Sequence, residues 1–232
     1  PSSTQSVPKR PQLWRRHWND FAPVAGKLDQ MRFATCFAVA LASAHIFADR
    51  QITVPMGKKI RDGVVRAEIL GVPGDRTTRA WLGTGFLQAY DFEWTSTRTK
   101  TRDWVQSFDF SYNFAPPITD ISPGISVGVQ DSLNRSENGR AVYLATTFRY
   151  GNTSELNQDI PTELTIGLWS RKSGLFFMGV SLPLTERILL IAEHDSERVA
   201  GGVELRPFRG LVLKSVFEAG GTSFGLSLNQ KF

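Results

Sequence analysis

The sequence predicts an all-β protein: an antiparallel up-and-down transmembrane β-barrel of about 10 to 12 strands that follows an N-terminal leader. Three observations predict this class. Apolar and polar residues alternate with a period of two over many short segments, turn-forming residues separate these segments, and no long helical segment lies between them. Neighbouring strands are then expected to pair as antiparallel hairpins, because parallel strands need long crossover connections.

The first element is a leader within residues 1–48. Met31 is followed by one positive charge, a short apolar run and small residues, which is the layout of a secretory signal peptide. The run is shorter than the roughly 20 apolar residues of a membrane-spanning helix, and a buried helix is the alternative interpretation. We expect a disordered upstream extension over residues 1–30, a signal peptide over 31–48 with cleavage after Ala44 or Ala48, and the barrel over 49–232. N-terminal sequencing of the exported protein tests whether Met31 is the initiator.

Strand-like segments follow one another through the rest of the chain. Aromatic residues occupy every even position from 108 to 114 and alternate with Ser, Asp, Ser and Asn, a pattern that an amphipathic helix does not produce. The segment 174–182 is the least regular, because residues 175–178 are all apolar. The alternation predicts eleven strands, over residues 63–70, 80–96, 103–114, 124–131, 140–150, 162–170, 174–182, 187–195, 199–207, 210–218 and 222–232.

Charged side chains collect on one face of these segments, and the opposite face carries almost none. A basic residue that faces lipid at the bilayer midplane costs about 2–4 kcal/mol, so a membrane barrel has to direct the charged face into its lumen. Small residues on that face suit a lumen that accommodates long charged side chains. They are Gly83, Gly85, Ser126, Gly128, Gly167, Gly202 and Gly225.

Alternation alone does not distinguish a lipid-facing surface from the core of a soluble barrel, but two features favour a membrane. Aromatic residues lie near strand ends, where interfacial girdles are found; they are Tyr90, Trp94, Trp104, Tyr112, Phe114 and Tyr150. The last segment places Phe224, Leu226, Leu228 and Phe232 on one face and ends on an aromatic residue, which resembles the signal for the outer-membrane barrel-assembly machinery. We therefore expect a protein of the cell outer membrane, with membrane lipid and that machinery as partners.

Composition excludes other classes. The single cysteine, Cys36, rules out an intramolecular disulfide and a cysteine-built metal site. The net charge of +5 arises mainly in residues 1–48, which hold six basic and two acidic side chains, so the body offers no basic stripe for nucleic acid. The mean hydropathy of −0.19 excludes a bundle of apolar helices.

Four stretches resemble the YjbH-like outer-membrane proteins that are associated with exopolysaccharide production. These stretches are residues 123–131 (PGISVGVQD), 143–150 (YLATTFRY), 192–195 (AEHD) and 201–207 (GGVELRP). The resemblance covers about residues 55 to 232. It implies a barrel of the cell envelope with a link to exopolysaccharide, although this chain is far shorter than full-length members and has Ser132-Leu-Asn-Arg135 in place of a glycine-rich turn.

Two groups of residues are candidate sites. The first is a charge cluster in the lumen, formed by Glu193, Asp195, Glu204, Arg206, Lys214 and Glu218, which could bind a polar ligand. The alternative is that these residues pair across strands and hold the barrel closed. The second is the motif Gly128-x-x-Asp131, in which Asp131 either contributes to a site or caps a turn.

The sequence gives little support for a catalytic site or a metal site. His194 is the only histidine after the leader, and the alternation places it on the apolar face, away from Asp195. No spacing typical of a metal site or a phosphate-binding glycine loop occurs. We expect no catalytic residue, no metal and no cofactor.

The sequence thus predicts a non-enzymatic outer-membrane barrel, linked to exopolysaccharide production or export, with a polysaccharide as a further partner. The first alternative is a soluble periplasmic β-barrel that binds an apolar ligand, and the second is a small lipid-modifying barrel enzyme. Heat-modifiable migration on a gel separates a membrane barrel from the soluble alternative.

Overall fold

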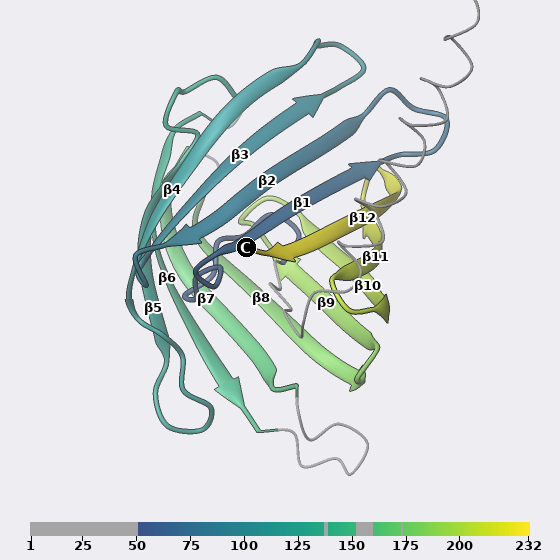
Figure 1. The fold of residues 1–232 in the computed structure, drawn as a ribbon. Helices are drawn as coiled ribbons and strands as arrows, with labels where there is room; N and C mark the ends of the chain where they lie inside the picture. Colours follow the sequence, from purple (N-terminus) through teal and green to yellow (C-terminus); the bar gives the residue numbers. More distant parts are fainter. Residues whose placement is uncertain (1–50, 137–138, 152–159, 173) are drawn as a thin grey trace, which may run out of the picture. The chain divides into compact units, whose positions relative to one another are not determined.

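Twelve strands form the fold in the computed structural model, which describes residues 51–136, 139–151, 160–172 and 174–232. The expected extension and signal peptide lie outside these residues. Figure 1 shows the strands as a ring. They are β1 (Val64–Gly71), β2 (Thr78–Phe86), β3 (Tyr90–Arg98), β4 (Val105–Ala115), β5 (Gly124–Gln130), β6 (Ala141–Tyr150), β7 (Thr162–Arg171), β8 (Gly174–Thr185), β9 (Ile188–His194), β10 (Val199–Phe208), β11 (Leu211–Glu218) and β12 (Gly221–Lys231).

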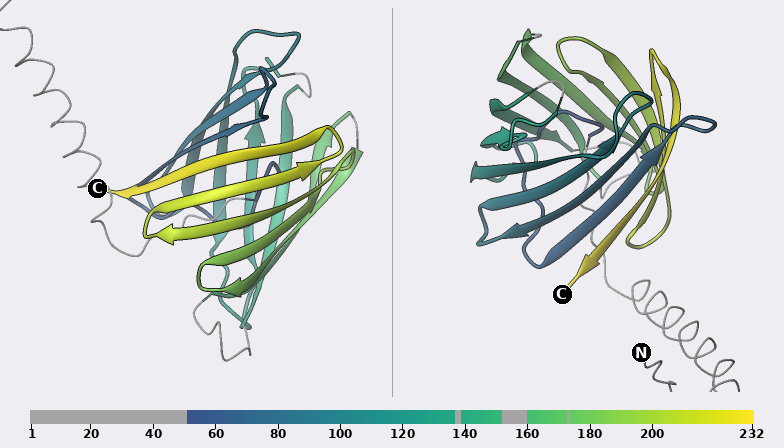
Figure 2. Two further views of the ribbon diagram at one scale, coloured as in Figure 1. Left: turned by 90° about the vertical axis from the view of Figure 1, so that its right-hand side faces the viewer. Right: turned by 90° about the horizontal axis from the view of Figure 1, so that it is seen from above.

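The strands close into an antiparallel barrel. Each strand pairs with the next along the chain, and β12 pairs with β1 to complete the ring, as the two views in Figure 2 show. In the closing pair Val64 lies opposite Lys231 and Gly71 opposite Phe224. Closure leaves no unpaired sheet edge, which is the condition for a β-structure to span lipid. Gly63 and Phe232 are hydrogen-bonded neighbours at one end, the terminal rim; the opposite end, which includes turns 72–77 and 195–198, is the distal rim.

The predicted strand 80–96 is wrong, because two strands and a turn occupy that range. Phe86 pairs with Tyr90, so the connection has three residues and the outward positions keep the same parity on both sides of it. Leu87 and Gln88 adopt positive φ angles of 52° and 58°. Those angles normally call for Gly or Asn, and neither is present, so the alternation runs through the turn without a visible signal.

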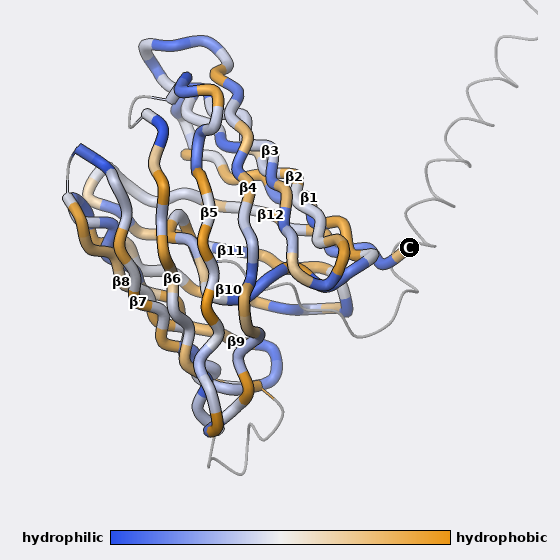
Figure 3. Tube along the Cα trace, turned by 90° about the vertical axis from the view of Figure 1, so that its left-hand side faces the viewer, coloured by the Kyte–Doolittle hydropathy of each residue, from blue (hydrophilic) through white to orange (hydrophobic). Residues whose placement is uncertain are grey.

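The barrel is apolar outside and holds its charges inside. Ile69, Leu144 and Leu213 are 50%, 47% and 41% exposed, whereas Glu68, Glu204 and Lys214 are 5%, 2% and 4% exposed. Figure 3 shows the resulting alternation of orange and blue along single strands. A water-soluble barrel would show the reverse distribution, so the strands cross a membrane, as in outer-membrane barrels. No helix among the described residues is long and apolar enough to cross a membrane.

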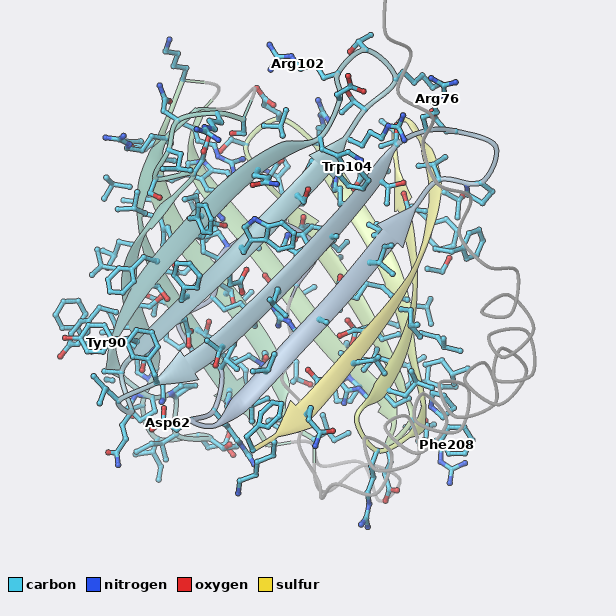
Figure 4. The ribbon with its side chains drawn as sticks, turned by 45° about the horizontal axis from the view of Figure 1, so that its top comes forward. Asp62, Arg76, Tyr90, Arg102, Trp104 and Phe208 are labelled. Atoms are coloured by element: carbon cyan, nitrogen blue, oxygen red, sulfur yellow. The ribbon has the colours of Figure 1, made fainter. Side chains whose placement is uncertain are left out.

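Aromatic side chains mark both ends of the outer surface. At the terminal rim the ring of Tyr90 lies 5.6 Å from that of Phe86 and 5.0 Å from that of Tyr112, and Tyr112 contacts Phe114 edge-on at 4.8 Å. Trp104, in the turn between β3 and β4, lies at the other end, as the labels in Figure 4 show. Aromatic rings at the two interfaces anchor a barrel at the level of the lipid head groups.

In the irregular segment 174–182, side chains point alternately into the lumen and outward, as in the other strands. Phe177 is completely buried in the lumen, while Phe176 and Met178 are 46% and 41% exposed on the outside. The sequence is apolar on both sides here because the lumen has an apolar region at this position, which the next subsection describes.

Candidate functional site

A segment that precedes the first strand lies inside the barrel. Residues 51–63, here called the lumen segment, form no strand, and their side chains at Gln51, Ile52 and Val54 are only 1–2% exposed. Figure 2 shows this part of the chain, at the purple end of the colour bar, within the ring of strands. The sequence predicted a barrel over residues 49–232 without distinguishing this segment from the wall.

Glu193 of β9 binds the start of the lumen segment. Its carboxylate accepts hydrogen bonds from the backbone N–H groups of Ile52 (3.0 Å), Thr53 (2.9 Å) and Val54 (3.2 Å), and from the Thr53 hydroxyl. Three consecutive N–H groups that converge on one carboxylate form a charge-assisted anion site built from backbone. Glu193 therefore holds the start of the lumen segment.

The middle of the segment contacts strands β4, β5 and β6. Gly57 donates its N–H to Thr147 Oγ1 at 2.8 Å and accepts from Asn113 Nδ2 at 2.9 Å. Ser126 Oγ donates to the carbonyl of Met56 at 2.6 Å. The backbone groups of Met56 and Gly57 are thus paired with lumen side chains, as burial requires.

The end of the segment is tied to β2, β3 and the turn between them. Ile60 donates its N–H to Asp91 Oδ1 at 2.9 Å, and Asp62 pairs with Gly85 as an isolated bridge. Asp62 also accepts from the N–H of Gln88 at 2.8 Å. The hydrogen bond from the Lys59 ammonium lowers the pKa of the Asp62 carboxyl.

Apolar side chains of the segment fill two apolar regions of the lumen. Ile52 packs in a cluster with Leu70, Trp81, Leu189, Ile191, Ala200 and Val216. Val54 packs in a second cluster with Tyr143, Ala145, Trp169 and Phe177. Each of these strand residues lies on the charged face of its strand, where a water-filled pore would have polar groups. Their partner is the lumen segment, and burial of a side chain such as Ile52 stabilises the arrangement by about 1.5–3 kcal/mol.

Several positions in the lumen hold glycine because the lumen segment passes directly against them. A Cβ atom on Gly85 would lie 1.9 Å from the carbonyl oxygen of Ile60, and one on Gly124 would lie 2.2 Å from that of Gly57. A Cβ on Gly179 would meet the side chain of Gln51 at 2.0 Å. The expected reason for small lumen residues, room for long charged side chains, is therefore wrong at Gly85, which leaves room for backbone.

Buried charges lie on the lumen faces of β1, β10 and β11. Lys214 Nζ of β11 lies 3.0 Å from Glu204 Oε1 and 3.3 Å from Glu68 Oε1, and Arg206 lies 3.5 Å from Glu204. All four side chains are at most 5% exposed. Their charges cancel, as do those of the nearby pair Arg66 and Glu93, whose atoms are 2.9 Å apart. The four residues Glu68, Glu204, Arg206 and Lys214, from β1, β10 and β11, are called the charge cluster below.

The six residues that the sequence grouped together occupy four places. Glu204, Arg206 and Lys214 belong to the charge cluster, and Glu193 binds the lumen segment. Glu218 pairs with Arg79 at 3.5 Å near the distal rim. Asp195 caps the β9–β10 turn by accepting from the N–H groups of residues 197 and 198.

The motif Gly128-x-x-Asp131 divides between a strand and a turn. Gly128 lies within β5, where a Cβ would be 2.6 Å from the ring and hydroxyl of Tyr143, so it is not a turn residue. Asp131 follows β5 with a φ of 48° and is 4% exposed. Its carboxylate accepts from the N–H groups of Arg135 (3.0 Å) and Ser136 (2.6 Å), which is a turn cap.

Replacing Asp131 by alanine is expected to destabilise the barrel by about 1–2 kcal/mol, because two N–H groups lose their acceptor. Asp131→Asn keeps one acceptor oxygen and should lose less. Urea unfolding of the protein in lipid vesicles measures both changes. Equal stability of Asp131→Ala and the parent protein would contradict the capping role.

A cavity of about 290 Å³ opens above the lumen segment toward the distal rim. Hydroxyl groups line it from Thr53, Thr95, Thr97, Thr99 and Ser107, together with the arginines Arg79, Arg102, Arg171 and Arg198 and the acids Asp109, Asp131, Glu193, Asp195, Glu197 and Glu218. This cavity is called the vestibule below. Its walls combine both signs of charge with many hydroxyls.

Arg171 has the most defined position among the vestibule arginines. Its guanidinium lies 3.7 Å from the centre of the Trp169 ring and donates to Gln130 Oε1 at 2.8 Å. Stacking on the indole and the hydrogen bond together fix the plane of the guanidinium. Arg171 can therefore offer its remaining N–H groups to a ligand with little loss of side-chain entropy.

The structure agrees with the expected position of His194. The residue lies on the outer side of the barrel, and its Nδ1 accepts from the N–H of Ser196 at 3.2 Å. Within the residues that the structure describes, no group of three or more His, Cys, Asp or Glu side chains could hold a metal ion.

No known protein family matches the sequence, and no curated protein matches it. Solved structures that are similar to it include a KdgM porin, at 10% identity and a TM-score of 0.47, and a KdgM porin in complex with disordered oligogalacturonate, with the same values. In both, 73% of this chain and 99% of the porin are covered. A NanC porin is similar at 9% identity and a TM-score of 0.44, with 73% and 98% covered. Identities this low assign neither a family nor a ligand.

Proposed function

We propose that this chain is a non-enzymatic outer-membrane barrel whose vestibule binds a polar, uncharged saccharide. The observation that carries the proposal is the vestibule itself, a lumen cavity rich in hydroxyls and guanidinium groups inside a barrel with an apolar exterior. Hydroxyl, carboxylate and guanidinium groups hydrogen-bond sugar hydroxyls. The walls carry six carboxylates and four guanidinium groups, and this excess of negative charge disfavours an anionic saccharide.

The structure supports this proposal over the two alternatives. A soluble barrel that binds an apolar ligand needs a free apolar interior, whereas Ile52 and Val54 of the chain itself occupy the apolar regions of this lumen. A lipid-modifying enzyme would use His194, whose Nδ1 accepts a hydrogen bond from the backbone of Ser196, and the neighbouring Asp195 caps the turn through residues 197 and 198.

The link to exopolysaccharide production is a further part of the proposal. It rests on the resemblance of residues 123–131, 143–150, 192–195 and 201–207 to YjbH-like proteins. The first and second of these stretches lie mainly in β5 and β6, and the last two lie in or next to β9 and β10. Deletion of the gene followed by measurement of secreted polysaccharide tests this link.

Arg171→Ala tests the vestibule as the binding site. The full chain, refolded in detergent, is titrated calorimetrically with neutral and with uronic-acid oligosaccharides. We expect binding of a neutral oligosaccharide and a loss of roughly tenfold or more in affinity in Arg171→Ala, since a hydrogen bond from a charged group contributes about 1.5–3 kcal/mol.

Arg187→Ala is the matched control, because Arg187 lies in the β8–β9 turn at the terminal rim, away from the vestibule. Its affinity should equal that of the parent protein. Parent protein that binds none of the oligosaccharides, or equal affinities for Arg171→Ala and Arg187→Ala, would contradict the proposal.

A further inference from the structure

The lumen segment and the charge cluster together occupy the interior of the barrel. Glu193 and Asp91, which hold the two ends of the segment, lie on β9 and β3, six strands apart in a ring of twelve and therefore on opposite sides. Between them the segment follows β4 to β6 through Asn113, Ser126 and Thr147. The charge cluster lies on β1, β10 and β11, three strands that also contribute apolar side chains to the cluster around Ile52.

From this arrangement we propose that residues 51–63 are a plug that closes the barrel. The Glu193 carboxylate holds the plug in place, and solute passes only when the plug leaves the wall. This inference rests on the proposed outer-membrane function. The segment does not belong to the β-ladder: its contacts with the wall are hydrogen bonds, the ion pair between Lys58 and Glu163 of β7, apolar packing and one isolated bridge. It can leave without breaking any strand pairing.

The plug borders the vestibule at Thr53. A second cavity of about 80 Å³ is lined by Thr53 and by Lys59, Arg66, Asp91 and Glu93. The two cavities thus meet at Thr53, which the Glu193 carboxylate binds, and at the wall residues Asp109 and Gln130. Movement of Thr53 away from Glu193 would join them into one path.

The base of the plug provides a hinge. Gly63 joins the segment to β1 with a φ of +70°, a conformation open to glycine at little cost. Its carbonyl accepts from the N–H of Phe232, which fixes the hinge to the end of β12. Motion about this point leaves β1 and its pairing with β12 in place.

Ile52→Glu tests the plug in the full chain. A carboxylate at position 52 would be buried among apolar side chains and close to Glu193, so the plug is expected to leave the wall while the barrel strands are unchanged. In planar lipid bilayers we expect the parent protein to conduct little and Ile52→Glu to raise the mean conductance by about tenfold. Heat-modifiable migration on a gel confirms that each variant is folded.

Arg61→Glu is the matched control, because Arg61 lies in the same segment but is exposed. Its conductance should equal that of the parent protein. A second readout uses Thr53→Cys in a Cys36→Ser background: a thiol reagent added to the bilayer-inserted protein should label position 53 several-fold faster when Glu193→Gln is also present.

Three outcomes decide between the proposals. Higher conductance in folded Ile52→Glu, or faster labelling with Glu193→Gln, supports the plug. Equal conductance of folded Ile52→Glu and Arg61→Glu, together with unchanged labelling, overturns the plug and leaves the outer-membrane function standing. Failure of the folded parent protein to insert into bilayers overturns the outer-membrane function, on which the plug depends.

Discussion

Lys214→Met is expected to destabilise the barrel by about 3–5 kcal/mol, the cost of leaving buried carboxylates without their cation. Lys214 Nζ lies 3.0 Å from Glu204 and 3.3 Å from Glu68, and these side chains are 2–5% exposed. Methionine keeps most of the volume of the side chain, so the loss of stability measures the effect of the missing charge and not a change in packing. Urea unfolding in lipid vesicles, followed by tryptophan fluorescence, measures it.

Restoring neutrality should recover most of the loss. In the double variant Lys214→Met with Glu68→Gln, one unpaired carboxylate is gone and Arg206 still faces Glu204 at 3.5 Å. Lys231→Met is the control, since Lys231 is exposed at the end of β12. If Lys214→Met unfolds at the same urea concentration as Lys231→Met, the charge cluster is solvated and does not close this side of the lumen.

The wall of the barrel could be predicted from the sequence because its signal is local. Successive side chains of each strand face the lipid and the lumen in turn, so apolar and polar residues alternate along the sequence with a period of two. The number of strands was harder to obtain. The connection from Phe86 to Tyr90 has an odd number of residues and no glycine, so β2 and β3 are indistinguishable from one long strand.

The lumen segment could not be predicted in the same way. Its contacts join residues far apart in sequence, such as Thr53 and Glu193, and most are made by backbone N–H groups that any residue carries. A signal was nevertheless present. Leu189 and Ile191 share a lumen face with Glu193, and apolar residues on a charged face indicate an apolar partner inside the barrel.

The sequence could place the residues of the candidate cluster on a strand face but could not give their partners. Parity along the strands places Glu193, Glu204 and Lys214 on one face, and they do face inward. Parity says nothing about height along the barrel axis or about what else occupies the lumen. Glu193 therefore has a different partner from Glu204, and the partners Glu68 and Arg79 come from β1 and β2.

Leu144→Arg is expected to cost about 2–4 kcal/mol if the outer face meets lipid, because Leu144 lies near the middle of β6 and points outward. On a surface that meets water, the same change to a 47% exposed side chain would alter stability by no more than about 0.5 kcal/mol. Ser107→Arg is the matched control, since Ser107 lines the vestibule and an arginine there can reach water. Urea unfolding in vesicles should show a loss for Leu144→Arg and little change for Ser107→Arg. Equal stability of the two variants would mean that hydrocarbon does not surround the apolar face, and the membrane assignment would then be wrong.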